Sequence, residues 1–180
     1  MRDLRFIPEC YIDSNIVETL LDSKGVNHQA GCYKVCSTMS KTYKDDFAVG
    51  IMDYDKKRPT YPNEFTQLAK SEHLKLLKHK SKHQYIIYIC PACEQFILDC
   101  SHQNNINLKT SYKIGNNLKD LQQQTKLSKS QKDPDFKKLF KYLREYNPEF
   151  TCLKNVLNYL KENPFQADEK VLKSFFNEKD

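Results

Sequence analysis

Three short apolar runs in the first hundred residues, at residues 4–8, 47–52 and 85–89, predict β-strands. The runs at 47–52 and 85–89 are near-continuous, which is typical of strands that are covered on both faces. Helix-like patterns fill the intervals, at residues 12–21, 32–43 and 63–78, and Asp13 or Ser14 is the N-cap candidate of the first of them. Pro91 is well placed to open a further helix. This alternation predicts an α/β fold with a parallel sheet flanked by helices.

The pattern changes after residue 100, so we divide the chain into an α/β domain at 1–100 and two further segments. Residues 101–133 are rich in Asn, Gln, Lys and Ser, which predicts a loop or mobile insert with one helical piece near 118–127. Residues 134–180 predict an α-helical C-terminal extension that packs on the same domain. Its apolar positions repeat at helical spacing, first at Phe136, Leu139, Phe140 and Leu143.

Carboxylates stand at the ends of two of the predicted strands. Glu9 closes the first strand, and Asp53 and Asp55 close the strand at 47–52. In parallel sheets, ligands bind at the carboxyl ends of strands, so we expect these three side chains to share one edge. Oxygen ligands of this kind suit Mg²⁺ or Mn²⁺. The simpler interpretation is that they are ordinary polar residues at strand ends, because Asp-x-Asp alone is a common pattern.

Composition limits the classes of function. The 180 residues carry a formal net charge of +6, which permits a nucleic-acid partner without requiring one. The loop Lys56-Lys57-Arg58, directly after Asp55, is a candidate nucleic-acid-binding segment, and the Lys- and His-rich stretch 70–83 is a weaker one. No Gly-x-x-x-x-Gly-Lys-Ser/Thr motif is present, so the chain is not itself a P-loop ATPase.

Seven cysteines, an odd number, and the lack of any apolar run near 18 residues predict a reduced, soluble protein of the cytoplasm, without a membrane segment. Cys90 and Cys93 form a Cys-x-x-Cys pair at a strand-to-helix junction, where a lowered thiol pKa would permit redox chemistry. A zinc site shared with Cys32 and Cys36 is a second interpretation. We favour a third, in which these cysteines are small buried apolar residues.

The strand-end acids also carry a resemblance to a known family. Glu9 in Phe-Ile-Pro-Glu-Cys, with Asp53 and Asp55 in Val-Gly-Ile-Met-Asp-Tyr-Asp, resembles the Toprim domain of topoisomerases, bacterial primases and OLD-type nucleases. The stretch 89–98, which carries Glu94, looks like a feature of stand-alone Toprim proteins related to OLD and RloB. The resemblance covers about residues 1–100.

The resemblance implies a Mg²⁺- or Mn²⁺-dependent, nuclease-like enzyme that processes phosphodiesters of DNA or RNA. Glu9 would be a general acid/base or metal ligand, Asp53 and Asp55 would hold the metal, and Glu94 would be a fourth carboxylate for a second ion. Alternatively, Glu94 is a first-turn Glu favoured by the helix dipole. A separate ATPase partner, as in OLD-like phage-defence systems, is also implied. The competing hypothesis is a non-catalytic module that binds nucleic acid or protein.

Overall fold

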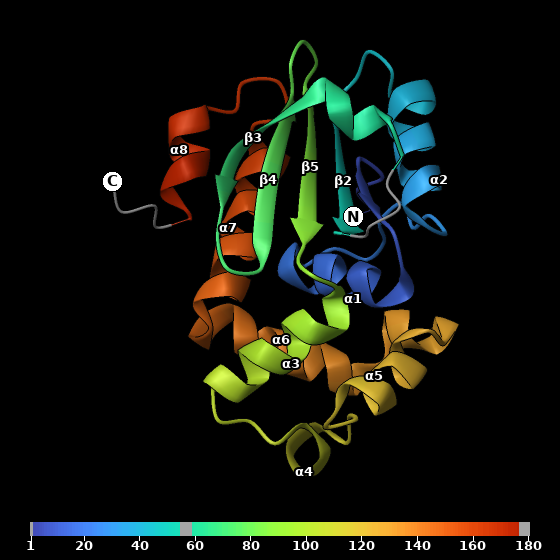
Figure 1. Cartoon of the computed structure of the whole chain (residues 1–180), viewed down its shortest axis with the longest axis vertical. Helices are drawn as coiled ribbons and strands as arrows, with labels where there is room; N and C mark the ends of the chain where they lie inside the picture. Colours follow the sequence, from blue (N-terminus) through green and yellow to red (C-terminus); the bar gives the residue numbers. More distant parts are fainter. Residues whose placement is uncertain (1, 55–58, 177–180) are drawn as a thin grey trace.

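A five-stranded mixed sheet forms one half of the molecule, and helices cover its faces and its lower end (Figure 1). The computed structural model describes residues 2–54 and 59–176. The strands lie in the order β1-β2-β5-β4-β3. Their bounds are Phe6–Pro8 for β1, Ala48–Asp53 for β2, Phe65–Lys70 for β3, Leu74–His79 for β4 and Gln84–Ile89 for β5. The predicted α/β class is therefore confirmed.

The sheet is parallel only in part, which corrects the expectation of a wholly parallel sheet. Strands β1, β2 and β5 are parallel, as the three apolar runs predicted. Strands β3 and β4 form an antiparallel hairpin beside β5, in the region where we expected a helix at 63–78. The Leu spacing there fits a helix, but Leu74 and Leu76 are buried at the two-residue spacing of a strand. Strand β3 buries Phe65 and Ala69, and its register with β4 shifts between Gln67 and Ala69.

The first helices lie close to their predicted positions. Helix α1 spans Tyr11–Leu20, and its N-cap is Cys10, not Asp13 or Ser14 as the sequence suggested. Helix α2 spans Cys32–Ser37 and continues into the π-helical turn η1, Thr38–Thr42. A 3-10 turn, η2 at Tyr61–Glu64, precedes β3. Helix α3 spans Cys93–Gln103, so Pro91 lies just before the helix.

The rest of the described chain is helical. The polar stretch 101–133 contains α4 at Leu108–Tyr112, α5 at Leu118–Thr125 and the 3-10 turn η3 at Ser128–Lys132. The C-terminal helices are α6 at Pro134–Tyr146, α7 at Pro148–Glu162 and α8 at Glu169–Ser174. Asp133 and Asn147 cap α6 and α7, each followed by Pro at the first helical position, the arrangement expected at helix starts.

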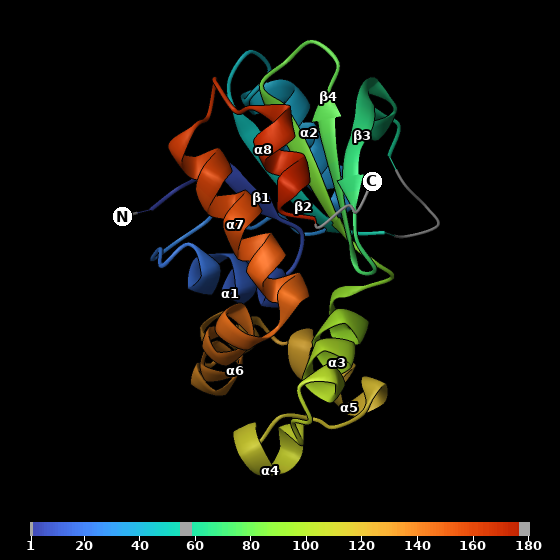
Figure 2. The same cartoon turned by 90° about the vertical axis from the view of Figure 1, so that its left-hand side faces the viewer.

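Two apolar clusters lie on opposite faces of the sheet. The larger one joins one face to α1, α3, α6 and α7, and the smaller one packs α2 against β1, β2 and β5. Figure 2 shows α7 and α8 on one side of the sheet. Within β2, Val49 and Ile51 belong to the larger cluster, whereas Ala48 and Met52 belong to the smaller one. Consecutive residues at the end of β2 therefore point to different faces.

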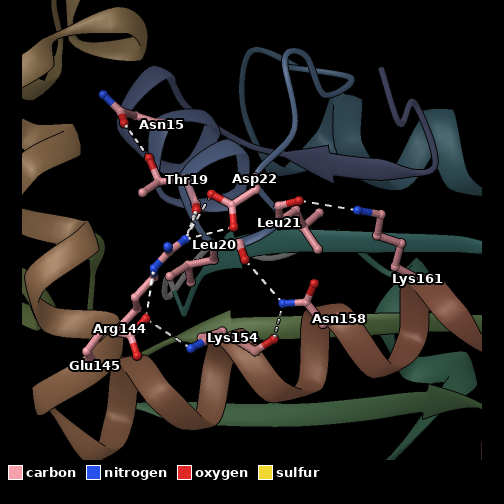
Figure 3. A network of polar contacts seen from close by, with 10 residues as sticks. All are labelled: Asn15, Thr19, Leu20, Leu21, Asp22, Arg144, Glu145, Lys154, Asn158 and Lys161. Atoms are coloured by element: carbon pink, nitrogen blue, oxygen red, sulfur yellow. Dashed lines mark hydrogen bonds and ion pairs between the residues drawn. The ribbon is translucent and has the colours of Figure 1, made fainter. Parts of the chain in front are cut away.

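Polar contacts fix α6 and α7 to the C-terminal end of α1 (Figure 3). The Arg144 guanidinium donates to the Thr19 carbonyl at 2.8 Å and pairs with Asp22 at 3.0 Å. Asn158 donates to the Leu20 carbonyl at 3.1 Å, and Lys161 donates to the Leu21 carbonyl at 3.2 Å. The last carbonyls of a helix lack partners within the helix, so side chains from α6 and α7 satisfy them here.

Candidate metal centre

Glu9 and Asp53 meet at the carboxyl edge of the two parallel strands β1 and β2. The Glu9 N–H donates to the Ile51 carbonyl at 2.9 Å, which continues the ladder one residue beyond β1. The Asp53 N–H then donates to Oε2 of the Glu9 carboxylate at 3.1 Å. Glu9 and Asp53 therefore lie at one edge of the sheet, as expected from the sequence, and are within hydrogen-bonding distance of each other.

The Asp53 side chain is held in turn by the start of α3. The Cys93 N–H, in the first turn of the helix, donates to Oδ1 of Asp53 at 2.9 Å. The first N–H groups of a helix have no partner within it, and the positive end of the helix dipole favours an anion. Asp53 thus links the end of β1, through its N–H, to the helix that follows β5, through its carboxylate.

Asp13 is a further acid of this edge, and sequence reasoning missed its role. It lies in the first turn of α1, four residues after Glu9, with a side chain that is 1% exposed. Neither oxygen of its carboxyl has a hydrogen-bond partner within the described residues. We interpreted Asp13 as a helix cap, whereas its place four residues beyond the strand-end Glu9 was the signal that could have identified it.

Burial and mutual repulsion make these acids weak. Burial is the main cause that raises the pKa of Asp13 to about 7, and the negative charges of Glu9 and Glu94 add to the shift. The thiols of Cys10 and Cys93 act in the opposite direction, because they stabilise the charged carboxylate. Burial also raises the pKa of Asp53 to about 9, with contributions from Asp13, Glu9 and Glu94, against the opposing N–H of Cys93.

Glu94 belongs to the same electrostatic group. It is half-buried in the first turn of α3, and its Oε1 accepts a hydrogen bond of 2.5 Å from the Thr125 hydroxyl at the end of α5. Its charge contributes to the raised pKa values of both Asp13 and Asp53. The causes of both shifts are burial and neighbouring carboxyls, together with donors at Cys10 and Cys93, so mutual repulsion adds to the effect of burial.

The residues of the basic loop and one of the paired aspartates lie outside the described residues: Asp55, Lys56, Lys57 and Arg58. Their predicted roles stay predictions. Within residues 2–54 and 59–176, no group of three or more His, Cys, Asp or Glu side chains is arranged to hold a metal ion. Mg²⁺ commonly uses only one or two carboxylates together with water and substrate phosphates. A cation at this edge would relieve the repulsion between the buried carboxyls of Asp13 and Asp53.

The cysteines support the apolar interpretation over the redox one. Cys93 is fully buried, and burial raises the pKa of its thiol well above the ordinary value, the opposite of what a reactive thiol needs. Cys36 is buried beside Met52, with 3.9 Å between the two sulfurs. The described residues contain no zinc-type cluster that joins Cys32 and Cys36 to Cys90 and Cys93.

The Lys- and His-rich stretch 70–83 lies on strands, not on a helix. His73 and His79 are buried, and each pairs with a carboxylate at 3.0 Å, His73 with Asp99 and His79 with Glu64. The Lys78 ammonium pairs with Glu169 on α8 at 2.9 Å. These three side chains therefore have structural partners, which weakens the prediction that the whole stretch contacts phosphates.

No helix of the described chain has both the length and the apolar content needed to cross a membrane. Compared with models of protein families, with curated proteins and with solved structures, the chain shows no match.

Proposed function

We propose that this chain contains a Toprim-like domain that cleaves phosphodiesters of nucleic acid with the help of Mg²⁺ or Mn²⁺. Glu9, Asp53 and Asp55 are the proposed metal-binding and catalytic residues, and Glu94 is the proposed ligand of a second ion. One observation carries the proposal: the hydrogen bond between the Asp53 N–H and Glu9, which joins two strand-end acids at the carboxyl edge of parallel strands.

The chemistry of the donors fits a hard divalent cation. Carboxylate oxygens are its preferred ligands, and the acids at this edge repel one another. A bound ion would supply charge neutralisation at the phosphate that is attacked. In this proposal Glu9 takes or returns a proton, and the N–H of Cys93 holds the Asp53 carboxylate in place.

Partners follow from the same proposal. Lys56, Lys57 and Arg58, directly after Asp55, would bind the phosphates that flank the site. The chain has no P-loop motif of its own, so a separate ATPase in an OLD-like phage-defence system is the proposed protein partner. DNA and RNA are both candidate substrates.

A second candidate function is a non-catalytic module that binds nucleic acid or protein on the same fold. It is favoured by one observation, namely that the described side chains contain no ready-made group of three metal ligands. In that case the basic segments would carry the affinity, and divalent ions would not bind.

A nicking assay distinguishes the two functions. Wild-type protein is incubated with supercoiled DNA and with single-stranded RNA, in Mn²⁺, in Mg²⁺ and in EDTA. We expect metal-dependent cleavage that Asp53→Asn abolishes, whereas Asp45→Asn, an exposed aspartate near the start of β2, leaves it unchanged. Cleavage of equal rate by Asp53→Asn and by wild type would contradict the catalytic role, and a lack of cleavage by all proteins would favour the binding module.

A further inference from the structure

A pocket of about 350 Å³ lies on the α2 face of the sheet, whereas the Asp53 side chain leaves β2 towards the other face. The strand register builds it. Lys75 of β4 is paired with Tyr88 of β5, which is paired with Met52 of β2, so Lys75, Tyr88 and the following Tyr54 share one face. The volume is at the lower end of the range found for small-ligand sites, about 300–1,000 Å³.

Tyr54 connects this pocket to the candidate metal centre, because it follows Asp53 directly. Its N–H donates to the Ile89 carbonyl at 2.9 Å, so the backbone stays in ladder geometry one residue beyond β2. The side chains of Asp53 and Tyr54 consequently leave the same strand end towards opposite faces. A ligand in the pocket therefore borders the edge where the carboxylates lie.

The inner wall combines aromatic rings with a cation. The Tyr54 ring meets the buried Tyr88 ring edge-on, with 5.2 Å between the centroids. The Lys75 ammonium lies 3.6 Å from the centre of the Tyr54 ring, and within the described residues it forms no ion pair. A half-buried ammonium held over an aromatic ring is a binding point for an anion.

Amide side chains complete the rim. Asn63 from the turn η2 and Gln67 of β3 line the pocket and are exposed to solvent. Amides present both a donor and an acceptor, which suits the polar edge of a nucleobase. Aromatic faces beside them suit the flat face of a base, and stacking of this kind recurs where proteins bind single-stranded nucleic acid.

We propose that this pocket binds one nucleotide unit, with its base against Tyr54 and its phosphate at Lys75. The proposal deepens the proposed function and rests on it for the identity of the ligand as part of a nucleic-acid strand. The same chemistry would also accept a free nucleoside monophosphate, so the experiment separates these two sources.

The test measures binding in EDTA, where the candidate metal centre cannot contribute. A short fluorescently labelled single-stranded DNA is titrated with the protein and followed by anisotropy, and unlabelled adenosine monophosphate is the competitor. We expect Lys75→Ala to weaken binding about tenfold, from the loss of one charge-assisted contact. Lys75→Arg should restore it, and Lys119→Ala, which removes an exposed charge on α5, should leave it unchanged.

The aromatic wall is tested separately. Tyr54→Leu should weaken binding at least about fivefold, the lower end for one base–aromatic stack, while Tyr54→Phe retains affinity. Tyr33→Leu, an exposed tyrosine on α2, is the matched control. Full competition by the monophosphate supports a free-nucleotide site, and binding of the strand alone supports a strand subsite. Wild-type affinity in Lys75→Ala and Tyr54→Leu, or no binding by wild type, would overturn the proposal.

The experiments distinguish an error in the pocket proposal from an error in the proposed function. Asp53→Asn should lose cleavage yet bind the labelled strand in EDTA as wild type does, because Asp53 lies on the other face of the sheet. If Lys75→Ala and Tyr54→Leu retain wild-type binding while wild type cleaves in a metal-dependent way, the pocket proposal is wrong and the catalytic one stands. If the two variants lose binding but no protein cleaves, the pocket proposal stands and the catalytic one is wrong.

Discussion

The N–H of Asp53 donates a hydrogen bond of 3.1 Å to the Glu9 carboxylate, across 44 residues of sequence. This contact exists because β1 and β2 are parallel neighbours, so the residues that follow them emerge at one edge. Around it the structure gathers Asp13 and Glu94, and their negative charges make each acid harder to ionise. The predictions below follow from this crowding and from the contacts that hold it in place.

Asp13 should make stability depend on pH. Its folded pKa, about 7, lies above the ordinary value of 3.8, so between these values the folded state binds more protons than the unfolded state. Stability therefore falls as pH rises through this window. Because Asp13→Asn removes the titration, we expect its free energy of unfolding minus that of wild type to be larger at pH 8 than at pH 5 by about 1–3 kcal/mol.

Urea unfolding at the two pH values measures this difference. Taking the difference between pH values cancels the pH-independent cost of the new amide. Asp45→Asn, at an exposed position, is the control and should shift by much less. An Asp13→Asn protein whose stability follows the pH dependence of wild type would show that Asp13 ionises normally in the folded protein.

Thr125 should position Glu94. Its hydroxyl, in a side chain that is 2% exposed, donates to the Glu94 carboxylate at 2.5 Å and links α5 to the candidate metal centre. Thr125→Val keeps the shape and removes the donor, so we expect a loss of about 1–3 kcal/mol of unfolding free energy. Thr110→Val, at an exposed threonine with a local contact of 3.4 Å, should cost less. Equal effects in the two variants would contradict a special role for Thr125.

Arg144 should fix the C-terminal helices to α1. It is mostly buried and contacts both the Thr19 carbonyl and Asp22, as Figure 3 shows. Arg144→Ala leaves that carbonyl without its donor, for which we expect a loss of about 1–3 kcal/mol in thermal or urea unfolding. Lys138→Ala, on the exposed face of α6, should change stability by no more than about 0.5 kcal/mol. A similar loss in both variants would mean that the network contributes little.

The sequence predicted the site residues that lie at strand ends. It did not predict the residues that reach the site through tertiary contacts. Apolar runs located β1, β2 and β5, and the rule for parallel strands brought Glu9 to Asp53. Asp13 was missed because an Asp near a helix start usually reads as a cap, whereas the Cys10 sulfur takes that place. The contact of Thr125 with Glu94 spans 31 residues and depends on how α5 folds back, which no local pattern contains.

The hairpin β3–β4 was misread for a related reason. Leu68, Leu74 and Leu77 fall near helical spacing. Leu74 and Leu76 are nevertheless buried in a strand, because β4 pairs with β5. Strand β3 in turn pairs with β4. Edge strands take their structure from the sheet beside them as much as from their own propensity. The same pairing placed Lys75 over Tyr54, a contact that no local sequence pattern predicts.

Calorimetric titration with Mn²⁺ tests the central claim most directly. We expect saturable binding by wild type that tightens from pH 6 to pH 9, because the carboxyls with raised pKa values must lose protons before they can bind the ion. Glu9→Gln and Asp53→Asn should each abolish it, and Asp45→Asn should not. No saturable heat in wild type, or undiminished binding by Asp53→Asn, would contradict a metal centre at the edge where Glu9 meets Asp53.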